Sequence, residues 1–269
     1  MNILELLTTD FILNAVIGGL ILAILLSVLS LFIYVKKWSF INVGISHAAF
    51  GGLAIGYIAG ISPSITGSIF AVIVGILIGF LSKRGKFHED ISIGILLSFS
   101  MALGVILISF SNNYNSDLFS FLFGNILTIT REDITTLGIF TVIAFAFLYV
   151  YFKKLLYCCF DEEVAKVSGV KTDFLYYSLI VLMAIATVLS IKLVGSILAS
   201  AMMILPAATS SQIFWHYRSI VVFSIIISIF TVVTGIFISF EFNLPSGSTI
   251  VMVYSVIFFV ITAVKRFLK

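Results

Sequence analysis

Nine long apolar runs divide this chain of 269 residues, and each is long enough to cross a lipid bilayer. A membrane-spanning helix needs about 20 mostly apolar residues to cross a hydrocarbon core of about 30 Å. The runs do not alternate strictly between apolar and polar residues, which argues against the strands of a barrel. They predict an all-α integral membrane protein, a polytopic bundle of about nine transmembrane helices, or eight if one run is re-entrant. The expected spans are 11–35, 41–60, 65–81, 91–110, 134–152, 173–191, 195–215, 219–240 and 248–265.

Composition supports this class. Hydrophobic residues make up 61% of the chain and charged residues 10%, whereas a soluble domain has about 45–50% and about 25%. A soluble globular enzyme and a disordered chain are therefore excluded. The net charge of +3 provides no basic surface for a nucleic-acid partner. The connections between the runs are short, so we expect residues 1–269 to form a single transmembrane domain.

The basic residues predict the orientation, because Lys and Arg are enriched in cytoplasmic loops. With the N-terminus outside, the inner connections and the C-terminus hold 13 of the 15 Lys and Arg residues, leaving only Arg131 and Lys192. We therefore expect the N-terminus outside and the C-terminus in the cytoplasm. The 13 inner residues are Lys36, Lys37, Lys83, Arg84, Lys86, Lys153, Lys154, Lys166, Lys171, Arg218, Lys265, Arg266 and Lys269.

The second run carries small residues at every fourth position, Gly44, Ala48, Gly52 and Gly56. Residues four apart share a helix face, so they form a smooth stripe that allows another helix backbone to approach closely. The stripe serves either plain helix packing or the lining of a shared pathway. His47 neighbours it and would point into the bundle. An ionisable group there is a candidate functional residue, although a structural histidine is the alternative.

The seventh run contains a glycine at its start and a proline in its interior, Gly195 and Pro206. Proline lacks an N–H group and clashes with the carbonyl four residues earlier, so a kink is expected. The two residues then serve either as a hinge or pathway-lining break, or as ordinary elements of helix packing.

The connection after the fifth run, residues 160–169, encodes a short helix with both ends specified. Asp161 suits the N-cap, and Glu162 and Glu163 place negative charge in the first turn. Gly169 suits the left-handed position just past the C-terminus.

A helix of about two turns is too short to be stable alone, so this one must dock on its own bundle or on a partner. Val164 and Val167 are three residues apart and share a face. A capped connector helix with no partner is the alternative.

Several motifs are absent from the sequence. No G-x-x-x-x-G-K-[ST] motif for nucleotide binding occurs, nor a G-x-S-x-G motif, so the chain is expected to be no enzyme and to bind no cofactor. No run has Asp or Glu at its middle, which argues against a transporter driven by a coupling ion. Three histidines are too few for a haem or di-iron membrane enzyme. Cys158 and Cys159 are adjacent, and neighbouring cysteines rarely form a disulfide; we assign them no role.

Five motifs occur in order: SHAAFGG at 46–52, LFGNIL at 122–127, FDEEVAKVSG at 160–169, VGSILASAMMILPAA at 194–208 and LPSG at 244–247. With them the chain resembles the permease subunits of the zinc, manganese and iron class of ABC transporters, over about residues 11–265. The resemblance implies a prokaryotic cell-membrane protein that pairs with a second copy of itself, cytoplasmic ATP-binding subunits and an extracytoplasmic metal-binding protein. It also implies that His47 lies in the metal translocation path. The short helix would couple the chain to the ATPase through Asp161, Glu162, Glu163, Val164, Ala165 and Gly169.

Two positions depart from the pattern of this family. Val43 stands where Asp is common, and Asn125 replaces the Asp of LFGDIL. Both changes remove a hard anionic oxygen, and imidazole suits zinc whereas manganese favours carboxylate. The transported metal is therefore expected to be zinc rather than manganese or iron. The alternatives are an ABC permease for iron-siderophores or cobalamin, and a secondary metal transporter that needs no ATP.

Overall fold

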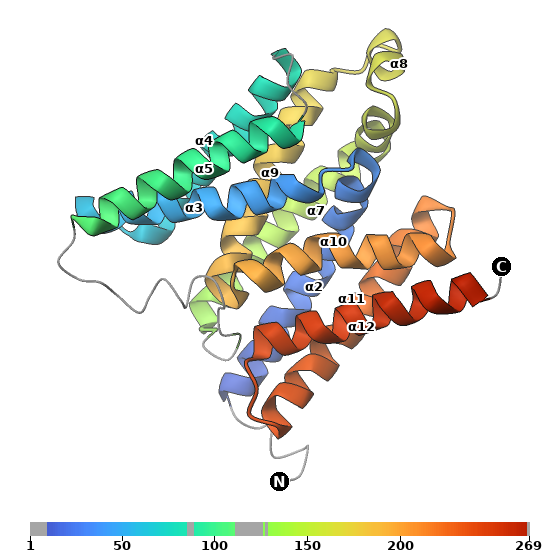
Figure 1. Cartoon of the computed structure of the whole chain (residues 1–269). Helices are drawn as coiled ribbons and strands as arrows, with labels where there is room; N and C mark the ends of the chain where they lie inside the picture. Colours follow the sequence, from blue (N-terminus) through green and yellow to red (C-terminus); the bar gives the residue numbers. More distant parts are fainter. Residues whose placement is uncertain (1–9, 85–88, 111–125, 127–128, 268–269) are drawn as a thin grey trace. The chain divides into compact units, whose positions relative to one another are not determined.

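The computed structural model describes residues 10–84, 89–110, 126 and 129–267, and these residues form helices and no strands. Nine of the described helices are long and apolar enough to cross a membrane, which confirms the predicted fold class. Their order is shown in Figure 1, together with that of α8, Glu162–Val167. The nine are α2 Asp10–Lys36, α3 Ser39–Ala59, α4 Pro63–Arg84, α5 Glu89–Ser109, α7 Arg131–Phe160, α9 Thr172–Val194, α10 Ser196–Ile213, α11 Tyr217–Glu241 and α12 Ser246–Phe267.

The helices agree with the predicted spans except at the end of α7. The span predicted at 134–152 belongs to a helix that continues to Phe160. Lys153 and Lys154 end the apolar run, but lysine is a good helix former and does not end the helix. The extension brings α7 to within one residue of α8.

Two compact units divide the chain, and each is built from separate segments. The first unit comprises residues 1–34, 119–150 and 193–269, and in it α10, α11 and α12 pack against one another. The backbones of α11 and α12 approach closely at Gly235, where a Cβ atom would lie 2.8 Å from the Cα of Ile250. A hydrogen bond of 3.0 Å from Ser224 Oγ to Ser210 Oγ links α11 to α10.

The second unit comprises residues 35–118 and 151–192. Here α3 packs along both α4 and α5, and Figure 1 shows the three helices side by side. The buried side chain of Asn42 on α3 accepts a hydrogen bond from Thr187 on α9. This bond links two apolar helices and satisfies the amide oxygen of Asn42, which would be costly to leave unpaired in a buried place.

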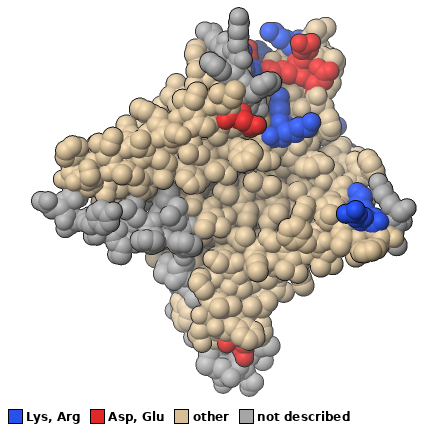
Figure 2. All heavy atoms as spheres, viewed as in Figure 1, with Lys and Arg blue, Asp and Glu red and all other residues tan. Residues whose placement is uncertain are grey.

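Charged side chains occupy little of the face that Figure 2 shows. In Figure 2, Lys, Arg, Asp and Glu gather mainly at the α8 end, and most of the visible face is uncharged. Large apolar side chains such as Phe99 and Val142 are more than half exposed, as expected for helices that face lipid. The sidedness of the termini remains a prediction, as does the single permease domain.

Candidate functional site

The short helix α8 is specified at both ends by interactions within a few residues. Asp161 has an extended backbone and accepts a hydrogen bond of 3.0 Å from the Val164 N–H, which makes it the N-cap. At the other end Gly169 has a φ of 78°. The Gly169 N–H donates to Lys166 O and the Val170 N–H to Ala165 O, both at 3.1 Å. This pair of bonds is a Schellman motif, which satisfies the last carbonyls of a helix.

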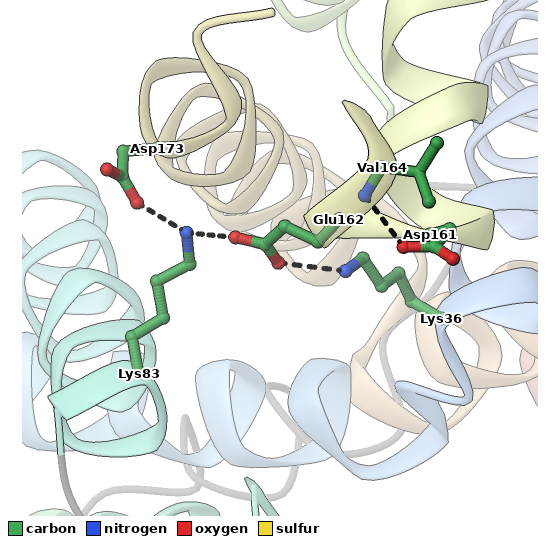
Figure 3. Close-up of polar contacts among 6 residues, drawn as sticks. All are labelled: Lys36, Lys83, Asp161, Glu162, Val164 and Asp173. Carbon is green, nitrogen blue, oxygen red and sulfur yellow. Dashed lines mark hydrogen bonds and ion pairs between the residues drawn. The ribbon is translucent and has the colours of Figure 1, made fainter. Parts of the chain in front are cut away.

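Glu162 pairs with two lysines of the second unit, and one of them also pairs with Asp173, as Figure 3 shows. Its two carboxylate oxygens lie 2.5 Å from Lys83 Nζ on α4 and 3.4 Å from Lys36 Nζ on α2. Lys83 Nζ also contacts Asp173 on α9 at 2.6 Å. We refer to Lys36, Lys83, Glu162 and Asp173 as the α8 ion network. Two positive and two negative charges make it neutral overall.

Aromatic rings surround the two ammonium groups of the α8 ion network. Lys83 Nζ lies 4.4 Å from the ring centroid of Tyr176, and Lys36 Nζ lies 5.8 Å from the same centroid. The ring of Trp38 packs edge-on against Tyr176 with a centroid distance of 5.2 Å. Aromatic faces attract cations, and more strongly where water is excluded. The rings therefore hold both lysines in place for Glu162.

The two sides of α8 differ in exposure. Ala165 is fully buried, and Glu162 is half-buried in the α8 ion network. Val164 is 48% exposed and Val167 is 89% exposed, and Glu163 beside them is also exposed. This apolar and acidic outer face is not covered by the described part of the chain. Docking of α8 on its own bundle is thus observed for one face, and the other is open to a partner.

His47 lies within α3 and is half-buried. Its Nδ1 atom is 2.9 Å from the carbonyl oxygen of Val43 and 3.2 Å from the hydroxyl of Ser46. The Ser46 hydroxyl itself donates to the same Val43 carbonyl at 2.8 Å. With Nδ1–H donating to that carbonyl, Nε2 keeps its lone pair. A bond of this kind commonly orients a metal-ligating histidine.

No complete metal site accompanies His47 in the described residues. They contain no group of three or more His, Cys, Asp or Glu side chains placed to hold a metal ion. Val43 contributes only its backbone oxygen to the histidine. Asn125, the second position where the family carboxylate is missing, lies outside the described residues.

The small-residue stripe of α3 is covered by neighbouring helices of the same unit. A Cβ atom on Gly52 would lie 2.7 Å from Thr66 O and 2.8 Å from the Cα of Gly67, both on α4. At Gly44 it would lie 2.7 Å from a methyl group of Ile93 on α5. Ala48 is fully buried, and a Cβ atom on Gly56 would lie 2.8 Å from Pro63 Cα. The stripe therefore packs closely against α4 and α5, and the lining of a pathway remains a prediction.

Gly195 and Pro206 differ in their local structure. Gly195 joins α9 to α10 with φ 83° and ψ 164°, a conformation open essentially to glycine alone. Pro206 is buried within α10, which continues on both sides of it, and its carbonyl accepts a hydrogen bond of 2.7 Å from Ser210 Oγ. A hinge at Gly195 and a kink at Pro206 remain predictions.

Sequence reasoning missed the partners of Glu162. In the sequence, Lys36 and Lys83 indicate only the orientation of the chain, and no pattern marks Asp173. The available signal was their position, because each lies at the end of a helix on the side predicted to carry α8. Tyr176 follows Asp173 by one turn and lies within an apolar run, where no pattern distinguishes it from a lipid-facing aromatic residue.

The comparisons with known proteins agree with this architecture. A model of the ABC 3 transport family matches residues 8–265. The chain is 33% identical to the manganese transport system membrane protein MntC of Listeria monocytogenes, over 93% of this chain and 89% of that protein. It is also 33% identical to the manganese import system permease protein ScaB of Streptococcus gordonii, covering 96% and 94% of the two chains.

A solved structure is similar as well. This structure, PsaBC from Streptococcus pneumoniae in complex with Fab, matches with a TM-score of 0.85 and 32% identity over 96% of this chain and 93% of that one. The family matched is the class that the five sequence motifs resemble, and the nine apolar helices among the described residues agree with a multi-pass protein of the prokaryotic cell membrane. The chain therefore belongs to the ABC 3 transport family, as a membrane permease subunit and not as an enzyme.

Proposed function

We propose that this chain is the permease subunit of an ATP-driven ABC importer of divalent transition-metal ions. The observation that carries the proposal is α8, a two-turn helix capped at both ends whose outer face is open. The sequence holds no nucleotide-binding motif, so a permease of this family needs a separate subunit to hydrolyse ATP. A short, exposed helix that is docked on its own bundle is suited to receive motion from such a subunit.

The cytoplasmic ATPase subunits would bind the outer face of α8. Val164 and Val167 supply apolar contact area there, and Glu163 adds negative charge. Lys166 is exposed on the same helix, so its exposed charges are mixed and the partner surface is expected to be an apolar recess. An extracytoplasmic metal-binding protein would deliver the ion, and a second copy of this chain would complete the pathway. Family resemblance supports these two partners.

His47 is the proposed metal-contacting residue of the pathway. Its Nδ1 is held by the Val43 carbonyl, which leaves Nε2 as the donor atom for a passing ion. Two copies of the chain would supply two imidazoles, fewer than the four ligands usual for a tightly held zinc ion. An incomplete ligand set suits transport, because tight binding would slow release.

The donor chemistry near His47 and the names of the relatives favour different metals. Imidazole without a nearby carboxylate favours zinc over manganese, and this remains our choice from donor chemistry. Two of the relatives are named as manganese transport proteins, and these names favour manganese. A transport assay with both ions decides between them.

The test is uptake by proteoliposomes that contain the complete complex, with zinc, manganese and iron offered separately on the loaded binding protein. We expect ATP-dependent uptake of one of these ions, and a loss of roughly tenfold or more for His47→Ala. His216→Ala is the matched control, because it removes an exposed histidine at the start of α11. Uptake without ATP would identify a secondary transporter, and uptake of a chelate alone would identify the siderophore or cobalamin class. Unchanged uptake by His47→Ala would refute the role of that residue.

A further inference from the structure

Glu162 faces its own bundle rather than the open side of α8. Both of its carboxylate oxygens are engaged by lysines of the same unit, Lys83 at 2.5 Å and Lys36 at 3.4 Å. The lysine side chains are only 17–18% exposed, and that of Glu162 is 33% exposed. A partly buried pair is screened by solvent less than a surface pair. Both oxygens of this carboxylate are therefore already paired within the chain.

The α8 ion network joins four helix ends at one point. Glu162 lies in the first turn of α8, Lys36 in the last turn of α2, Lys83 near the end of α4 and Asp173 in the first turn of α9. Apart from the fully buried Ala165, the side chains of α8 are exposed or half-buried. Little apolar burial therefore holds this helix, and a helix of six residues is unstable without external support.

We infer that Glu162 is a positioning residue that anchors α8 to the ends of α2, α4 and α9, and that it does not contact the ATPase. It acts through Lys36 and Lys83, which the rings of Trp38 and Tyr176 hold in place. The anchor transmits displacement of α8 to the transmembrane helices, whereas the outer face of α8 makes the contact with the partner. The consequence for transport rests on the proposed function, but the anchoring itself does not.

Hydrogen exchange of the full-length protein in lipid nanodiscs tests the anchor without the ATPase. Glu162→Gln keeps the size of the side chain and removes its charge. We expect the amides of residues 164–170 to exchange roughly three- to tenfold faster, because local opening reports the stability of the helix. Amides of α10 to α12 are the internal reference. Glu163→Gln is the matched control for exchange, since its side chain is exposed on the other side.

A double-mutant cycle tests whether Glu162 acts through Lys83. If it does, Glu162→Gln combined with Lys83→Gln changes exchange no more than the larger single effect. Lys171→Gln removes an exposed lysine beside α8 and serves as the control for charge loss. Additive effects of Glu162→Gln and Lys83→Gln, or exchange at residues 164–170 that stays within twofold of the parent, would overturn the anchor.

The complete reconstituted complex then links the anchor to transport. We expect Glu162→Gln to retain the ATPase subunits on co-purification and to lower the number of metal ions moved per ATP by several-fold. Loss of the ATPase subunits from this variant would show that Glu162 is a contact residue and overturn the inference. Faster exchange with unchanged ions per ATP would overturn its role in coupling. If even the parent complex fails to transport with ATP, the proposed function fails and the exchange result still decides the anchor.

Discussion

The packing of α3 against α4 gives a prediction at Gly52, where two helix backbones meet with no room for a side chain. A Cβ atom at this position would lie 2.6 Å from the Cβ of Phe70, 2.7 Å from Thr66 O and 2.8 Å from the Cα of Gly67. Two of these neighbours are backbone atoms of α4. Gly52→Ala therefore forces α4 away from α3, since no flexible side chain can move aside.

The size of the effect follows from a comparison with an open glycine. Gly94 on α5 has no atom within 4 Å of its ideal Cβ position. Both Gly52→Ala and Gly94→Ala gain about 1 kcal/mol of helix propensity. Overpacking at Gly52 costs about 1–3 kcal/mol. The difference between the two variants isolates this cost, because the propensity gain cancels.

The assay is thermal unfolding of both variants in the same detergent, followed by a thiol-independent probe such as intrinsic tryptophan fluorescence. We expect Gly52→Ala to melt roughly 3–10 °C below Gly94→Ala, using the usual dependence of melting temperature on free energy for a chain of this size. Gly138→Ala on α7, also in open space, should behave like Gly94→Ala. Equal melting temperatures for all three variants would refute the close-packing argument.

Three further predictions concern single contacts. Asp161→Ala removes the N-cap of α8 and should weaken this helix by about 0.5–2 kcal/mol, seen as faster amide exchange at Val164, whereas Asp161→Asn should retain most of the protection. Gly195→Ala places a Cβ in a conformation open essentially to glycine and should cost about 1–3 kcal/mol, measured as a lower melting temperature; no change would mean that the backbone adapts freely there. Thr187→Val removes the donor to buried Asn42 and should destabilise by about 1–3 kcal/mol. Thr187→Ser keeps the hydroxyl, and a melting temperature as low as that of the valine variant would contradict this reasoning.

Features set by neighbouring residues could be predicted from the sequence. The apolar runs predict the nine long helices found in the described part of the chain, because lipid demands about 20 apolar residues in succession. The ends of α8 could be predicted because Asp161 caps an amide only three residues away, and Gly169 adopts the left-handed conformation within the same turn. These interactions need no knowledge of the rest of the fold.

Contacts between distant segments could not be predicted in the same way. Lys36 and Glu162 are 126 residues apart in the sequence, and a lysine at a helix end fits a cytoplasmic loop equally well with or without a partner. The helices that cover the stripe of α3 were likewise unpredictable, because small residues show only that some backbone comes close. His47 stands out as a histidine inside an apolar run, yet a metal site depends on several side chains brought together by the fold.

The lengths of α7 and α10 set how this protein fits a bilayer. At about 1.5 Å per residue, the 30 residues of α7 extend about 45 Å and the 18 residues of α10 about 27 Å. A hydrocarbon core is about 30 Å thick. The part of α7 beyond Lys153 and Lys154 lies past the end of its apolar run and extends outside the hydrocarbon core, whereas α10 has no extra turn and is expected to make the surrounding lipid thin. Hydrophobic mismatch therefore acts mainly on α10. The acyl-chain length of the surrounding lipid is thus expected to affect the helix that contains Pro206.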